Sequence, residues 1–194
     1  MTKNDVKKLF GITLAGLGTA LVLYPSLHEA GHSLMTLLVG GEVVEFHLFP
    51  LPNVLCSLRE QNTAEVVLIG LSGMLFPFVI SCLPSCKNFW LWYVKWSLKG
   101  ISLLSFLISA VVVIMFQCGT PVENDDMTRV METYPQGATM YLALFALLSV
   151  YVIWRMVEDR PINRLLSLFE LQKKGELENV RTLEKDRDRL AKNQ

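Results

Sequence analysis

The sequence predicts an all-α polytopic membrane protein with about four to six transmembrane helices, a short β segment after the helix carrying the HEAGH motif, and a cytoplasmic helical tail. Composition is the first observation: 52% of the 194 residues are hydrophobic, and they gather in long runs almost free of charge. Charge distribution is the second, because residues 155–194 hold 10 of the 18 Lys and Arg and 8 of the 18 Asp and Glu. A membrane domain followed by a solvated tail explains both.

The expected boundary between the two parts follows the last apolar run. Residues 1–157 form the membrane-embedded domain, and residues 158–194 form the charged cytoplasmic helical tail, whose first part, 161–171, is amphipathic and expected on the membrane surface. The net charge of zero gives no basic excess for nucleic acid, so no nucleic-acid partner is expected. The expected location is the cell membrane, with the lipid bilayer as a partner and no cleaved signal peptide.

The first apolar run extends from Leu9 to Gly41 and is too long for one simple span. As a single helix it would measure about 50 Å, against a hydrocarbon core of roughly 30 Å. Proline fits the first turn of a new helix, so Pro25 is the expected break. The sequence therefore predicts two segments, Leu9–Tyr24 and Ser26–Val39, the second ending at Gly40-Gly41.

The second segment carries His28-Glu29-Ala30-Gly31-His32, the H-E-x-x-H pattern. Residues four apart lie on one face of a helix, so His28 and His32 can offer two imidazoles to one metal ion. Glu29 is adjacent and could take a proton from a water molecule bound to that ion. Zinc is the expected metal, because it accepts such ligands and keeps a position for water. Removing three polar groups from water into an apolar helix costs free energy, which indicates that these residues have a function.

A strand is expected after this helix, over Glu42–Pro52, where Val and Phe are frequent. A strand edge beside the metal site could hold an extended peptide by β-augmentation. His47 lies in this strand and is expected at the surface or the membrane interface, with a third metal ligand as the alternative. The following segment, Asn53–Ala64, is polar and is expected to be a loop.

Three further apolar segments bring the expected number to five: Val66–Leu83, Ile101–Phe116 and Ala138–Trp154. The first contains Gly70-Leu71-Ser72-Gly73, which could bring its backbone close to the metal helix. Lys87, Lys95 and Lys99 surround an aromatic cluster that is typical of a membrane interface. Basic residues at both ends of the chain favour two cytoplasmic termini, which requires an even number of spans.

One acidic cluster lies between the later spans. Asn124 is the expected helix N-cap, and Asp125 and Asp126 follow in the first turn. Either aspartate could complement the helix dipole or act as a metal ligand. A catalytic zinc ion needs a third protein ligand, which favours the second role.

Together these features resemble the site-two-protease family of intramembrane zinc metalloproteases. The resemblance rests on the HEAGH helix, Gly40-Gly41, the Val/Phe-rich strand, the span around Gly73 and the late aspartate. It implies that His28 and His32 are zinc ligands, that Glu29 is the catalytic base, and that a late aspartate is the third ligand. Asp126 is favoured, because Met127 and Val130 continue an apolar helical face, and Asp125 is the alternate. The family's Leu-Asp-Gly context is absent, since Met127 follows.

Two functions therefore remain open from the sequence. The first is a zinc metalloendopeptidase, occupying residues 1–157, that cleaves a membrane-embedded or membrane-proximal segment of a regulatory protein. Its partners would be a membrane protein substrate and, as a further option, a regulatory membrane protein. The alternative is a non-catalytic membrane scaffold with a structural or vestigial metal site. Glu29 favours the enzyme, because a purely structural metal site does not need a general base.

Overall fold

The computed structural model describes residues 3–47, 52–58, 62–84 and 88–167. In chain order the elements are α1 (Lys3–Gly18), the π-helical segment η1 (Thr19–Leu23), α2 (Tyr24–Leu38), β1 (Glu42–His47), β2 (Asn53–Ser57), α3 (Thr63–Cys82), α4 (Phe89–Gln117), α5 (Asp126–Thr133), the 3-10 turn η2 (Pro135–Gly137) and α6 (Ala138–Glu158). The described part of the chain is mostly helical with one small sheet, as expected, whereas residues 48–51 of the predicted strand and the predicted tail beyond residue 167 lie outside the described residues.

Four of the described helical stretches are long and apolar enough to cross a membrane: Asp5–Leu38, Thr63–Cys82, Phe89–Gln117 and Pro135–Ser167. Their outward faces carry many large apolar side chains, of which Leu21, Leu147 and Val150 are each about two-thirds exposed. Water-soluble proteins rarely expose apolar surface on this scale, whereas a bilayer would cover it.

The expected break at Pro25 is wrong, so the described chain has four candidate spans where the sequence predicted five apolar segments. Helix α1, η1 and α2 follow one another without interruption through Asp5–Leu38. Pro25 lies at the start of α2, directly after the π-helical turn, in which the Tyr24 N–H donates to the Thr19 carbonyl. Proline removes one backbone donor, and a wider turn beside it allows the helix to continue.

The strand prediction after α2 is confirmed for β1, but the loop prediction for Asn53–Ala64 is wrong in part. Asn53–Ser57 forms β2, which pairs antiparallel with β1, and α3 already begins at Thr63. Val54 and Cys56 alternate with more exposed neighbours, a strand pattern too short to stand out from a polar segment.

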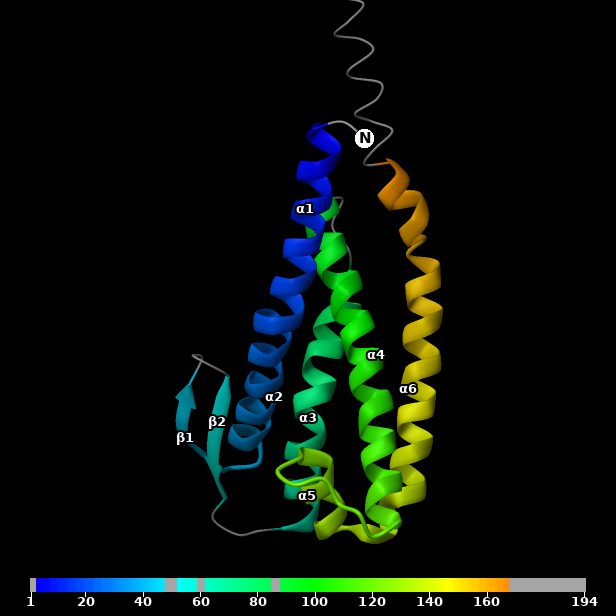
Figure 1. Cartoon of the computed structure of the whole chain (residues 1–194). Helices are drawn as coiled ribbons and strands as arrows, with labels where there is room; N and C mark the ends of the chain where they lie inside the picture. Colours follow the sequence, from blue (N-terminus) through cyan, green and yellow to red (C-terminus); the bar gives the residue numbers. More distant parts are fainter. Residues whose placement is uncertain (1–2, 48–51, 59–61, 85–87, 168–194) are drawn as a thin grey trace, which may run out of the picture.

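The four long helices lie side by side, with the β-hairpin beside α2 and the short α5 across one end of the bundle (Figure 1). The start of α1 and the end of α6 lie at the opposite end (Figure 1). The core combines side chains from α3, α4, α5 and α6: Leu71, Met74, Phe78, Phe106, Val112, Val113, Met127, Val130, Met131, Tyr141, Phe145 and Val152. Helix α5 is thereby anchored in the core, which fixes its first residues.

Helix α2 packs closely on α3, as the Gly70–Gly73 stretch led us to expect. A Cβ atom added at Gly31 would lie 2.5 Å from the Ser72 carbonyl oxygen, and one added at Gly73 would lie 2.4 Å from Nε2 of His32. These distances are too short for any side chain. The two glycines therefore allow α2 and α3 to approach each other at the level of the HEAGH motif.

Lys95 and Lys99, predicted beside the aromatic cluster at a membrane interface, are both buried within the protein, and their place relative to a membrane stays a prediction. Lys95 Nζ donates to the carbonyl oxygens of Leu83 and Pro84, and Lys99 Nζ pairs with Asp159 after α6. Lys87 lies outside the described residues. The aromatic rings stack on one another, as in the parallel pair Phe89 and Tyr93. The ammonium groups of Lys95 and Lys99 therefore connect the ends of neighbouring helices, because a buried ammonium group needs a partner.

Candidate metal centre

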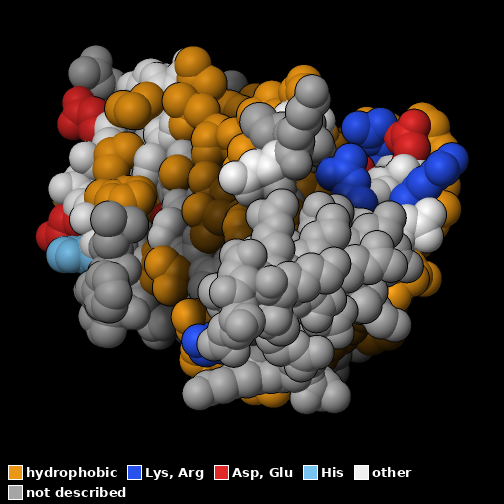
Figure 2. Space-filling model, turned by 90° about the horizontal axis from the view of Figure 1, so that it is seen from above, with side chains coloured by type: hydrophobic (Ala, Val, Ile, Leu, Met, Phe, Trp, Pro, Cys, Tyr) orange, Lys and Arg blue, Asp and Glu red, His pale blue; other side chains and the backbone are white. Residues whose placement is uncertain are grey.

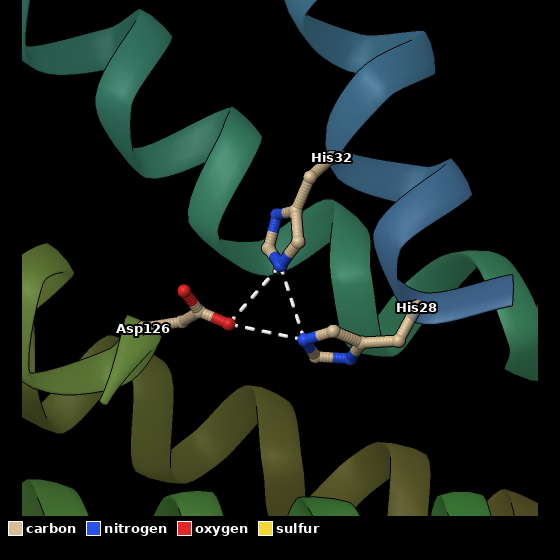
Figure 3. A group of neighbouring side chains, drawn as sticks. All are labelled: His28, His32 and Asp126. Carbon is tan, nitrogen blue, oxygen red and sulfur yellow. Dashed lines mark hydrogen bonds and ion pairs between the residues drawn. The ribbon is translucent and has the colours of Figure 1, made fainter. Parts of the chain in front are cut away.

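The two histidines of the HEAGH motif face the same side of α2. One helical turn separates them, and their ring centroids lie 4.7 Å apart. Asp126, the first residue of α5, reaches the same point from a distant part of the sequence (Figure 3). Among the described residues these three side chains form a group that could hold a metal ion, with all ligand atoms within 4.8 Å of one another.

The three ligand atoms form an equilateral triangle. His28 Nε2, His32 Nε2 and Asp126 Oδ2 lie 3.0 Å from one another in every pair (Figure 3). Ligand atoms around a tetrahedral zinc ion, with bonds of about 2.0–2.1 Å, lie roughly 3.3–3.4 Å apart. The residues therefore fit a zinc ion after a small outward movement, and the set of two imidazoles and one carboxylate is a known ligand combination for catalytic zinc. The geometry is not specific to zinc.

The ring of His32 is held from behind by the backbone of α3. Its Nδ1 lies 2.8 Å from the Ile69 carbonyl oxygen, which also accepts a hydrogen bond from the Ser72 hydroxyl. A carbonyl only accepts, so Nδ1 donates to it, and Nε2, which faces the triangle, is the ring nitrogen available to a metal ion. Metal-binding histidines usually have such a partner, because it fixes both the tautomer and the ring orientation.

Asp126 is ionised in this arrangement. Burial by itself would raise the pKa of its carboxyl group, but hydrogen bonds with His28 and His32 outweigh that effect and hold the pKa below its usual range. A carboxylate ready to bind a cation therefore faces the two imidazoles.

Asp125, the alternate metal ligand, caps helix α5 instead. It is the N-cap of α5, and its Oδ1 accepts hydrogen bonds from the backbone N–H groups of Met127 and Thr128. The expected cap, Asn124, instead lies one residue before the cap with a φ of 58°. The N-cap prediction is thus wrong by one residue, and the difference directs Asp126 to the histidines.

Glu29 borders the same site. Its side chain is half-buried and lines a pocket of about 530 Å³ together with His32 and Asp126. The carboxylate accepts a hydrogen bond from the backbone of Val54 on β2. Glu29 is not one of the three grouped ligands, and it borders the pocket beside them.

The pocket also contains Asn53 on β2 and Arg129 on α5, which sequence reasoning did not single out, and Asn124, which was expected only as a helix cap. No motif marks Asn53 and Arg129, because they come from two separate segments. His47, considered as a third ligand, lies exposed on β1 and pairs with Glu45. It does not join the described group of ligands.

Comparison with protein-family models, with curated proteins and with solved structures finds no match for this chain.

Proposed function

We propose that this protein is an intramembrane zinc metalloendopeptidase. The observation that carries the proposal is the convergence of His28, His32 and Asp126 on one point, with Glu29 in the adjoining pocket. The resemblance to the site-two-protease family, drawn from the sequence, assigns the same roles to the same residues. The four long apolar helices support a place in the membrane, proposed here to be the cell membrane.

His28, His32 and Asp126 would hold the zinc ion. Bound there, zinc would supply Lewis-acid chemistry, lowering the pKa of a water molecule and polarising a substrate carbonyl group. The Ile69 carbonyl keeps His32 in the tautomer required for this ligand role.

Glu29 would act as the general base and then as the general acid. It is adjacent to His28 in sequence and faces the pocket, so it could accept a proton from the attacking water and deliver it to the leaving amine. A purely structural metal site would not need a general base in this position.

The substrate would be an extended segment of a membrane protein, embedded in the bilayer or close to it. One wall of the pocket is β2, through Asn53, Val54, Leu55 and Cys56. A helical substrate would have to unwind before cleavage, because the carbonyl groups of an intact helix are already hydrogen-bonded. Binding beside β2 would offer its backbone new partners.

Glu29→Gln tests this proposal. The variant should retain zinc, since the three ligands are unchanged, and lose about 10²-fold to 10⁴-fold in cleavage. New peptide termini in membranes of cells producing wild-type or variant protein would be compared by quantitative mass spectrometry. Glu45→Gln on the exposed face of β1 is the matched control, because it removes the same charge away from the pocket. Equal cleavage by wild type and Glu29→Gln would contradict the role assigned to Glu29, and no cleavage above that in cells lacking the protein would favour the scaffold.

A further inference from the structure

A second cleft lies between α4 and α6, at the end of the bundle where the described part of the chain begins and ends. Its volume is about 730 Å³. Most of its wall is apolar and includes Trp96, Leu103, Ile153 and Val157, whereas Arg160 and Asn163 supply polar groups. None of these residues belongs to the metal centre.

The cleft lies beside a corner of the chain, the short interruption of the helix that follows α6. The helix ends at Glu158, and Arg160 has a φ of 45°, in the left-handed region that is unfavourable for a residue with a side chain. The chain is helical again over residues 161–167. Lys99 holds this corner in place through its buried ion pair with Asp159. The corner presents Arg160 at the rim of the cleft.

The rim carries positive charge. Lys99 is balanced by Asp159, and Arg155 by Glu158. Arg160 has no ion-pair partner among residues 3–47, 52–58, 62–84 and 88–167. Figure 2, which views this end of the bundle, shows Lys and Arg side chains gathered on one side of it beside hydrophobic surface. An arginine above an apolar wall matches a ligand with an anionic head and a hydrocarbon chain.

We propose that this cleft binds an anionic phospholipid of the surrounding membrane leaflet. The phosphate group would contact the guanidinium group of Arg160 and the amide of Asn163, and an acyl chain would lie along Leu103 and Ile153. The apolar wall favours a lipid over a free phosphate ion, and the arginine favours an anionic lipid over a neutral one. The inference does not depend on the proposed protease activity.

Native mass spectrometry of the full-length protein tests the inference, with phosphatidylglycerol and phosphatidylcholine of identical acyl chains as probes. Wild type should bind phosphatidylglycerol preferentially. Arg160→Gln should lower that binding on the order of fivefold, and Ile153→Trp, which fills the cleft, should lower binding of the same lipid. Arg164→Gln is the matched control, because Arg164 stacks over Trp92 and does not line the cleft.

Three results would overturn the inference. They are a wild type without preference for phosphatidylglycerol, unchanged binding by Arg160→Gln, and equal losses in Arg160→Gln and Arg164→Gln. The last would indicate a general attraction between basic residues and anionic lipid. Unchanged zinc content and thermal unfolding of each variant would show that the fold is retained, so a loss of lipid can be assigned to the cleft.

Discussion

The two neighbouring aspartates at the start of α5 have different roles. Asp125 satisfies the free N–H groups of the first helical turn, and Asp126 faces the histidines. Asp125 precedes the helix in an extended conformation and its Oδ1 accepts from the helix backbone, so among the described residues only Asp126 joins the histidines. Sequence alone left both open as the third ligand, because either could have been the cap. The position of the cap decided the matter, and it depends on how α5 packs in the core.

Gly73 is the residue whose replacement best tests how closely α3 must approach the metal centre. A Cβ atom there would lie 2.4 Å from Nε2 of His32 and 2.8 Å from Cε1 of His28. Gly73→Ala should therefore displace the imidazoles and lower zinc affinity by about tenfold or more. Zinc affinity would be measured by competition with a chelator of known strength.

Gly18→Ala is the matched control for Gly73→Ala. It adds the same methyl group to a helical glycine, but no atom lies within 4 Å of the new Cβ atom. Zinc affinity should stay at the wild-type value. Equal affinity in wild type and Gly73→Ala would mean that contact with α3 does not position the histidines.

At the scale of elements, the long apolar helices could be predicted well from the sequence, but the way the first span passes Pro25 could not. Hydropathy marks a span because the bilayer accepts only apolar helices. Proline breaks many helices, yet here the π-helical turn Thr19–Leu23 precedes it and the helix continues. Such a turn depends on local hydrogen bonds, for which composition gives no signal.

The hairpin shows a second limit of sequence reasoning. The strand Glu42–His47 was predictable from its β-branched and aromatic residues, whereas its partner Asn53–Ser57 was not. A strand of five residues is recognised mainly by its pairing. The missed strand matters for the candidate site, because Val54 contacts Glu29 and β2 forms one wall of the pocket.

At the scale of the whole molecule, the described part of the chain begins and finishes at the same end of the helix bundle, and the metal centre lies toward the opposite end (Figure 1). Residues 39–62 and 118–134, which connect long helices near the metal centre, contain only Arg59 and Arg129 of the 18 Lys and Arg. The positive-inside rule therefore predicts cytoplasmic termini and, with them, a metal centre toward the outer side. The family resemblance implies a metal centre in the cytoplasmic half.

Cysteine labelling in intact cells distinguishes these orientations. Cys118 is exposed at the end of α4 near α5. With Cys56, Cys82 and Cys86 replaced by Ser, it should react with a membrane-impermeant maleimide added outside. A cysteine introduced by Thr2→Cys in a Cys-free chain should react only after the membrane is opened. The reverse pattern would place the metal centre toward the cytoplasm, as the resemblance implies.

The central claim is that His28, His32 and Asp126 hold one zinc ion, and the most direct test is the zinc content of the purified protein. Wild type should contain about one zinc per chain, and His28→Ala and Asp126→Asn should contain little, since each removes one of three ligands. Asp125→Asn should keep its zinc, because asparagine also caps a helix. A wild type without metal after zinc is supplied, or equal zinc in Asp126→Asn, would contradict the claim.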